Sequence, residues 1–196
     1  LAYDIYPLAG YMLHPSPKVL KKQQEMAFAF DLPLVWGTDY RPEGRTLSVA
    51  RDLEVPAIYV EYGGGTGIRP KVIEEYKAGV MNVLRYLNML EDPITSPALC
   101  DKYWIEDYRQ DSGYLQGKMP SPVDGIFISK VKIGDKVKAG ELFGKVIESY
   151  SGKPVNLYAD TDGLVFLLRT MVKVKQGDAL GGILPMGTLN ERVIYE

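Results

Sequence analysis

The chain of 196 residues is long enough for one large domain or two small ones, and its hydrophobic fraction of 46% supports a buried core. Its 23 basic and 25 acidic residues give a net charge of −2, which provides no general attraction to nucleic acid or anionic lipid. We therefore expect a small-molecule partner and neither a nucleic-acid nor a membrane partner. The single cysteine, Cys100, excludes an intramolecular disulfide framework and favours a cytoplasmic protein.

The first half of the chain alternates predicted helices and strands. Helical spacing of apolar residues follows Ser16-Pro17, and a short apolar run ending at Gly37 is typical of a buried strand. In chain order, the predicted elements are a helix over 17–30, a strand over 32–36, a short helix over 46–53, a strand over 56–62 and a helix over 70–90. This alternation predicts a parallel α/β sheet with right-handed crossovers, in which the strand at 56–62 is central.

The second half has no helical period and is predicted to be all β. We place the domain boundary near residue 95, which gives an α/β domain over 1–95 and a β domain over 96–196. Residues 122–183 contain an internal repeat, in which Asp124-Gly125 recurs 38 residues later as Asp162-Gly163. Each copy is too small to bury its own apolar residues, so we expect the two copies to pack as pseudo-twofold halves of one flattened barrel or sandwich.

Glu61 is the strongest candidate for chemistry. It ends a strand that is otherwise apolar, and Gly63, Gly64 and Gly65 follow it. Ligands of open α/β sheets bind outside the carboxyl ends of the strands, where a partly desolvated carboxylate acts as base and then as acid near neutral pH. A strand-end glutamate also serves as a cap or an ion-pair partner, so the residues alone leave both roles open. A phosphate loop is disfavoured because the glycines lack a GxxxxGK[ST] pattern.

A catalytic zinc site needs three protein ligands, usually including two or more histidines. His14 is the only histidine, so this chain cannot build such a site by itself. A serine-histidine-acid mechanism is also disfavoured, because the G-x-S-x-G elbow is missing.

Two segments carry a resemblance to a known family. The stretch "VPAIYVEYGGGTGIRP", with "AGVMNVLRYLNML" after it, is similar to the catalytic glutamate, glycine loop and helix of the succinylglutamate desuccinylase/aspartoacylase family. The form with three glycines and a threonine is nearest to the branch of the N-acetyl-diaminobutyrate deacetylases. The β segment from "SPVDGIFISKVKIGDKVKAGELFGKV" to "GLVFLLRTMVKVKQGDALGGILP" resembles the C-terminal domain of that branch.

The resemblance implies the C-terminal portion of a zinc-dependent deacylase that hydrolyses an N-acyl amino acid or related amide. Its fold would be part of a carboxypeptidase-like mixed sheet with helices, followed by a biotinyl/lipoyl-like β barrel-sandwich domain. Zinc would be held by an HxxE motif and a DLH motif upstream of Leu1, and Glu61 would be the general base and acid. The acyl group, the amine and the oligomeric state stay open, and a homo-oligomer is compatible with the sequence.

The resemblance further implies substrate contacts at Gly63, Gly64 and Arg51. Arg51 precedes Glu61 by ten residues, the spacing at which aspartoacylase-like members place a carboxylate-binding arginine. A bidentate guanidinium suits that task. The alternative for Arg51 is a solvated residue on the short helix, and the branch with three glycines does not clearly keep an arginine there.

A second function class is a carrier or binding module. The β repeat also resembles biotinyl/lipoyl domains, which present a modified lysine on the hairpin between their halves. Lys153 is near that hairpin, but Pro154 follows it directly and the usual flanking residues are missing. A mass shift on Lys153 would distinguish a carrier from an enzyme whose β domain is not modified.

Overall fold

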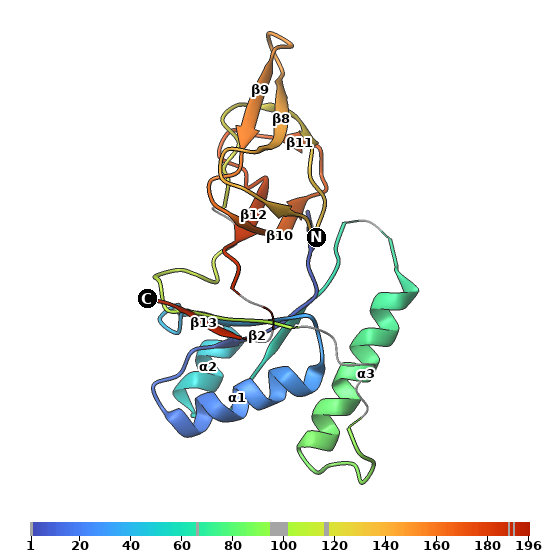
Figure 1. Cartoon of the computed structure of the whole chain (residues 1–196), viewed down its shortest axis with the longest axis vertical. Helices are drawn as coiled ribbons and strands as arrows, with labels where there is room; N and C mark the ends of the chain where they lie inside the picture. Colours follow the sequence, from blue (N-terminus) through green and yellow to red (C-terminus); the bar gives the residue numbers. More distant parts are fainter. Residues whose placement is uncertain (1, 66, 95–101, 116–117, 188, 190) are drawn as a thin grey trace. The chain divides into compact units, whose positions relative to one another are not determined.

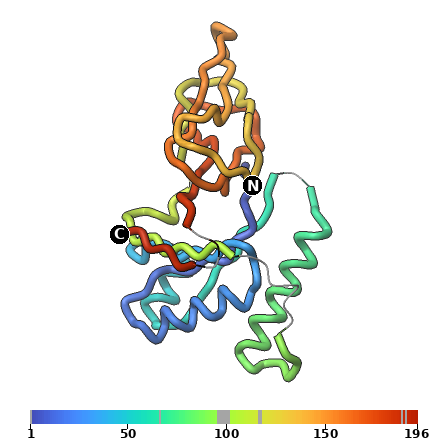
Figure 2. Tube along the Cα trace, viewed as in Figure 1, coloured from blue at the N-terminus to red at the C-terminus, as the bar shows by residue number. Residues whose placement is uncertain are grey.

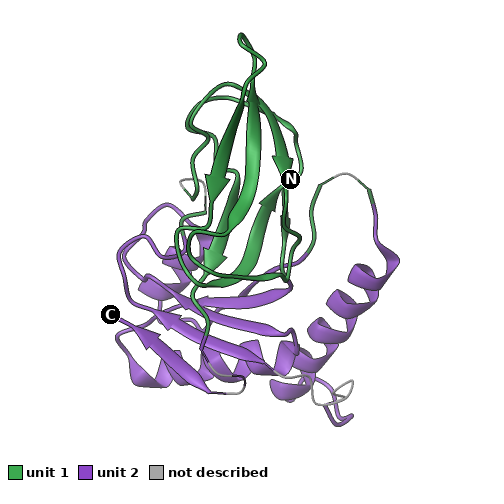
Figure 3. Cartoon of the chain, turned by 45° about the horizontal axis from the view of Figure 1, so that its top comes forward, with its two compact units in different colours: residues 1–6, 63–67, 114–186 green, residues 7–62, 68–113, 187–196 purple. Residues whose placement is uncertain are grey.

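The computed structural model describes the whole chain except residues 1, 66, 95–101, 116–117, 188 and 190. The chain forms two compact units, each assembled from three separate segments (Figure 3). The β unit contains residues 1–6, 63–67 and 114–186, and the α/β unit contains residues 7–62, 68–113 and 187–196. Within the described residues, no helix is long and apolar enough to cross a membrane.

The predicted division into 1–95 and 96–196 differs from these units, and the boundary itself falls among residues outside the described ranges. Residues 1–6 and 63–67 belong to the β unit, whereas 102–113 and 187–196 belong to the α/β unit. Strand pairing is the reason, since β1 (Tyr3–Ile5) pairs with β10 (Gly163–Arg169). A three-residue strand leaves no periodic signal in the sequence from which this pairing could be predicted.

The α/β unit is built on a five-stranded mixed sheet in the order β13-β5-β3-β2-β4. Its strands β2 and β13 are labelled in Figure 1. Its strands are β2 (Leu8–Met12), β3 (Leu34–Thr38), β4 (Tyr59–Glu61), β5 (Tyr103–Asp107) and β13 (Arg192–Tyr195). Strands β2, β3, β5 and β13 are parallel, and β5 and β13, far apart in sequence, lie side by side (Figure 2). The predicted mixed α/β class is therefore confirmed for this unit.

Strand β4 departs from the prediction in both position and direction. It lies at one end of the described sheet and runs antiparallel to β2, with Leu8 opposite Glu61 and Gly10 opposite Tyr59. The prediction of a central parallel strand was therefore wrong. A parallel partner needs a crossover that carries the chain back across the sheet. The helix α2 (Thr46–Asp52) is short and ends beside His14, just past the end of β2. The chain therefore runs back along the sheet as β4, which makes β4 antiparallel to β2.

The helix α1 (Pro17–Phe30) covers part of this sheet and begins and ends where the sequence predicts. It turns Val19, Ala27 and Phe30 into the core. The helix α3 (Pro70–Tyr86) packs against α1, where Phe30 lies so close to Gly79 that a Cβ there would come within 2.3 Å of the ring. The fully buried members of the apolar core around α1 and the sheet are Ala9, Tyr11, Leu13, Ala27 and Val35.

The β unit contains two four-stranded sheets. One sheet has the order β1-β10-β12, with β7 also paired to β10, and the other has the order β11-β6-β8-β9. Besides β1 and β10, the strands are β6 (Gly125–Ser129), β7 (Lys136–Val137), β8 (Leu142–Glu148), β9 (Pro154–Tyr158), β11 (Lys173–Val174) and β12 (Gly181–Leu184). The core between them is apolar and includes Phe127, Val137, Phe143, Val146, Val165, Val174 and Leu180.

The two copies of the sequence repeat pair reciprocally. Strand β7 of the first copy pairs with β10 of the second, and β11 of the second pairs with β6 of the first. The Asp-Gly turns are equivalent as well, because Asp162 Oδ1 accepts the backbone N–H of Ala139 at 2.8 Å and Asp124 Oδ1 accepts that of Gln176 at 2.7 Å. Reciprocal pairing of this kind is what a twofold relation between the halves requires.

Candidate functional site

Glu61 is the last residue of β4, and its side chain is half-buried. Because β4 is antiparallel to β2, Glu61 lies opposite Leu8, where the parallel strands begin. The expectation that Glu61 shares the carboxyl edge of the parallel strands was therefore wrong. The neighbouring Tyr62 lines a cavity of about 300 Å³ between the end of α1 and the face of α3, which also includes Phe30, Leu32 and Asn82.

The electrostatic setting of Glu61 suits proton transfer. Burial raises the pKa of the Glu61 carboxyl group above its ordinary value. Within the part of the chain that the structure describes, no hydrogen bond or ion pair holds this carboxylate. A half-buried carboxylate with a raised pKa and a free lone pair can accept a proton near neutral pH and return it.

Two tyrosines flank Glu61. Burial raises the pKa of Tyr59 and of Tyr76, and the negative charge of Glu61 raises both further. The Tyr59 ring lies over Gly10 of β2, where a Cβ would come within 2.1 Å of the ring carbon Cζ. The Tyr76 hydroxyl donates a hydrogen bond to the Val60 carbonyl at 3.3 Å.

The glycines after Glu61 have a structural reason to be glycine. Gly63 exchanges two backbone hydrogen bonds with Ile5, at 3.0 and 3.1 Å, within the β unit. Gly64 has a φ of 146°, and a Cβ there would come within 1.8 Å of the Tyr3 carbonyl oxygen. The close approach of two backbones therefore accounts for Gly64 without a ligand. Substrate contacts of Gly63 and Gly64 stay a prediction.

Arg51 lies at the end of α2, and its guanidinium already has several partners. It donates to the carboxylates of Asp52 and Glu43, at 2.7 and 2.8 Å, and to the backbone carbonyls of Tyr40 and Pro42. Its side chain is 12% exposed. The backbone carbonyl of Arg51 contacts His14, beyond the end of β2, whereas Glu61 lies opposite the start of β2. The structure therefore does not bring Arg51 to Glu61, and a substrate role for Arg51 stays a prediction.

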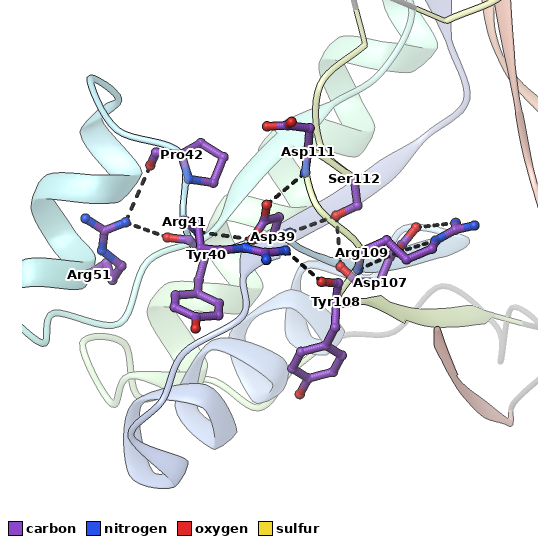
Figure 4. Close-up of polar contacts among 10 residues, drawn as sticks. All are labelled: Asp39, Tyr40, Arg41, Pro42, Arg51, Asp107, Tyr108, Arg109, Asp111 and Ser112. Carbon is purple, nitrogen blue, oxygen red and sulfur yellow. Dashed lines mark hydrogen bonds and ion pairs between the residues drawn. The ribbon is translucent and has the colours of Figure 1, made fainter. Parts of the chain in front are cut away.

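The carboxyl ends of β3 and β5 carry a polar network that sequence reasoning missed (Figure 4). The tripeptide Asp-Tyr-Arg occurs at residues 39–41 and again at 107–109, in each case where a strand ends. In both copies the buried aspartate accepts the backbone N–H and the Nε–H of the arginine two residues later. The repeated tripeptide after two apolar runs was the signal in the sequence.

Residues that follow the second tripeptide link the two tripeptides by hydrogen bonds. Asp39 Oδ2 accepts the backbone N–H of Asp111 at 2.8 Å, and the Ser112 hydroxyl joins the backbone N–H of Asp39 to the Asp107 carbonyl. Burial alone would raise the pKa of Asp39, but hydrogen bonds from Arg41 and Asp111 hold it below its usual value. The Asp39 carboxylate is therefore ionised and fully engaged, and Asp107 is held by Arg109 in the same way, which indicates a structural role for both residues.

The described residues do not fit a zinc site. In the described ranges, no group of three or more His, Cys, Asp or Glu side chains could hold a metal ion. His14 accepts the backbone N–H of Ser16 at Nδ1 (3.0 Å), and its Nε2 contacts the Arg51 carbonyl at 3.2 Å, so both ring nitrogens are engaged. Cys100 lies outside the described residues. Zinc held by upstream ligands stays a prediction.

Lys153 lies in the turn that joins β8 to β9, and its side chain is exposed. Its backbone carbonyl accepts the N–H of Glu148 at 3.0 Å, and the carboxylate of Glu148 in turn accepts the N–H of Ser151 at 3.1 Å. The turn is therefore well supported by hydrogen bonds, and Lys153 is an exposed residue within it.

No protein-family model and no curated protein matches this chain. Solved structures do match in fold. They include a succinylglutamate desuccinylase/aspartoacylase from Rhodobacter sphaeroides (TM-score 0.81, 19% identity, 95% of this chain and 56% of that one). A succinylglutamate desuccinylase from Silicibacter sp. TM1040 gives a TM-score of 0.82 at 19% identity, over 94% of this chain and 55% of that one.

A third match is the product-bound ectoine utilization protein EutE from Ruegeria pomeroyi, with a TM-score of 0.79 at 20% identity. It covers 92% of this chain and 54% of that one. The chain thus spans about half the length of the solved structures it matches. These TM-scores show that the chain shares their fold, and identities of 19–20% carry the comparison no further than the fold.

Proposed function

We propose that this chain is the C-terminal portion of a zinc-dependent deacylase of the succinylglutamate desuccinylase/aspartoacylase family, acting on an N-acyl amino acid or a related linear amide. The observation that carries the proposal is the Glu61 carboxylate, half-buried, without a partner among the described residues and with a raised pKa. The shared fold with structures of that family supports the same conclusion.

In this reaction Glu61 is the general base and then the general acid. It accepts a proton from the water that attacks the amide carbon, and a C–O bond forms. It then gives that proton to the leaving nitrogen as the C–N bond breaks, so that one water yields a carboxylic acid and an amine. A carboxyl group with a raised pKa can perform both steps near neutral pH.

The zinc ligands in this proposal are upstream of Leu1, because the described residues do not supply them. The substrate is a small N-acylated amino acid, and the protein is cytoplasmic. Arg51, Gly63 and Gly64 are the substrate contacts that the family resemblance implies. Of these, Arg51 would have to exchange its present carboxylate partners for the substrate.

For the β unit we propose a non-carrier relative of the biotinyl/lipoyl domains. The reciprocal pairing of its two halves supports the relationship. The alternative is a carrier that is modified at Lys153, which is exposed in the turn between β8 and β9. Intact-mass analysis of protein purified from its native host decides between them, because a carrier would carry an added mass on Lys153.

The test of the enzymatic proposal is Glu61→Gln in the complete protein, assayed on a panel of N-acyl amino acids. The amide keeps the size of the side chain but cannot accept the proton, so kcat falls by about 10²-fold or more while folding is unchanged. Glu74→Gln is the matched control, since Glu74 is an exposed glutamate on α3 whose side chain is 71% accessible. Near-normal turnover of the Glu61 variant would remove Glu61 from the mechanism.

A further inference from the structure

The strand that carries Glu61 has little support from the sheet. Strand β4 is three residues long, and in the described sheet it has β2 as its one neighbour. All three of its residues are only partly buried, whereas every residue of β2 and β3 is buried. A general base has to be held in a narrow range of positions, because small displacements are costly in rate. Contacts outside the sheet therefore have to hold β4.

Tyr76 of α3 makes such contacts with the residues on both sides of Glu61. Its hydroxyl donates to the Val60 carbonyl at 3.3 Å. Its ring stacks on that of Tyr62, with centroids 6.4 Å apart and planes 20° apart. One side chain thus contacts the residue before Glu61 and the residue after it.

Tyr76 is itself held by the packing of the two helices. Its ring meets Phe30 of α1 edge-on, with centroids 6.1 Å apart and planes 84° apart. Phe30 is 5% exposed and lies against Gly79, one turn further along α3. The position of Tyr76 is therefore set by the α1–α3 contact, and its ring and hydroxyl extend that contact to β4.

We propose that Tyr76 is a positioning residue for Glu61, which it keeps in place through Val60 and Tyr62. The proposal rests on the proposed function of Glu61 as the general base. Tyr76 acts on turnover through the strand and makes no contact with substrate. Loss of its contacts therefore lowers kcat and leaves KM nearly unchanged.

Two variants of Tyr76 in the complete protein distinguish its hydrogen bond to Val60 from its stacking on Tyr62. Tyr76→Phe keeps the ring and removes the hydrogen bond to Val60, and we expect kcat to fall about 5-fold with KM within twofold. Tyr76→Leu also removes the stacking on Tyr62, and we expect about a 30-fold loss, below the ~10²-fold cost of a 1 Å misplacement.

The pH profile gives a second readout. Among the described residues, the charge of Glu61 raises the pKa of two titratable side chains, Tyr59 on β4 and Tyr76 on α3. In Tyr76→Leu the end of β4 is less covered, so Glu61 is better solvated and its pKa falls toward the ordinary value. Since the base works in its deprotonated form, the acid limb of kcat/KM moves to lower pH.

Tyr86→Phe is the matched control. Tyr86 is on the same helix, its hydroxyl donates to Glu25 of α1, and the ammonium of Lys22 lies 4.1 Å from its ring. This control removes a hydrogen bond between α1 and α3 and should leave kcat unchanged. An equal loss in Tyr86→Phe would attribute the effect to helix docking in general and overturn the proposal.

The remaining outcomes also decide. A rise in KM at constant kcat would make Tyr76 a substrate-binding residue, and unchanged kcat in a folded Tyr76→Phe would show that its hydroxyl holds nothing in place. If Tyr76→Leu does not fold, Tyr76→Phe alone settles the matter. Glu61→Gln in the same assay distinguishes a failure of this inference from a failure of the proposed function. If the Glu61 variant is inactive while both Tyr76 variants are fully active, the positioning role of Tyr76 is refuted and the role of Glu61 stands.

Discussion

Gly10→Ala is the perturbation whose effect can be read most directly from the structure. Gly10 is in β2, directly opposite Tyr59 of β4. An added Cβ would lie 2.1 Å from the Tyr59 Cζ and 2.5 Å from its hydroxyl oxygen. These distances are far below van der Waals contact, so the ring has to leave its place. Because Tyr59 and Glu61 are two residues apart on one strand, they share a face of the sheet, and moving Tyr59 disturbs Glu61.

Overpacking of a filled site costs about 1–3 kcal/mol, and we expect Gly10→Ala at the upper end of this range because the ring is rigid and packs directly on Gly10. Urea unfolding monitored by circular dichroism measures this loss, and kcat should fall with it. The partner variant is Tyr59→Ala, which makes room for the new methyl group. In that background Gly10→Ala should cost less than about 0.5 kcal/mol, so the two changes are strongly non-additive. Equal costs of Gly10→Ala in both backgrounds would refute the proposed collision.

Two further predictions concern the network at β3 and β5 and the β unit. Asp39→Asn should destabilise the protein by about 1–3 kcal/mol at neutral pH, because it weakens the buried bonds to Arg41 and Asp111. The pKa of Asp39 is depressed in the folded state. Its stabilisation is therefore present above the unfolded pKa of about 3.9 and is lost as pH falls through the lower folded pKa, where the wild type and the variant should converge. Lys153→Ala should leave stability within about 0.5 kcal/mol and turnover unchanged, as for an exposed site, and a selective loss of turnover would favour the carrier alternative.

The elements that the sequence predicted well are those with a strong local signal. Pro17 at the first turn and a regular apolar spacing define α1, and the structure has it over the same residues. In the β unit the recurrence of Asp124-Gly125 as Asp162-Gly163 identified two copies that do pair reciprocally. Both features depend on residues close together in the chain, or on a pattern that is simply repeated.

The direction of β4 could not be predicted, because it depends on where the connection before it ends in the folded chain. The apolar run before Glu61 has the same composition whether its strand is parallel or antiparallel to β2. The direction is decided by α2, which ends beside His14 and so leaves the return across the sheet to β4. For the same reason Arg51 and Glu61 lie far apart, although the family resemblance gives a meaning to their ten-residue spacing.

The direction of β4 also decides which side chains can take part in chemistry at Glu61. His14, beside Arg51, is six positions after Leu8, which lies opposite Glu61, and at ~3.3 Å per residue the two ends are about 20 Å apart. The charged residues at the far end, Asp39 and Asp107 among them, are engaged with arginines of their own segments. Among the described residues of the α/β unit, groups that complete a site at Glu61 can come from the beginnings of β2 and β3 or from α3, and a further source is a segment outside these residues. Reconstitution of activity by adding an upstream segment with the HxxE and DLH motifs would support the last source, and a loss of that activity in Glu61→Gln would tie it to this carboxylate.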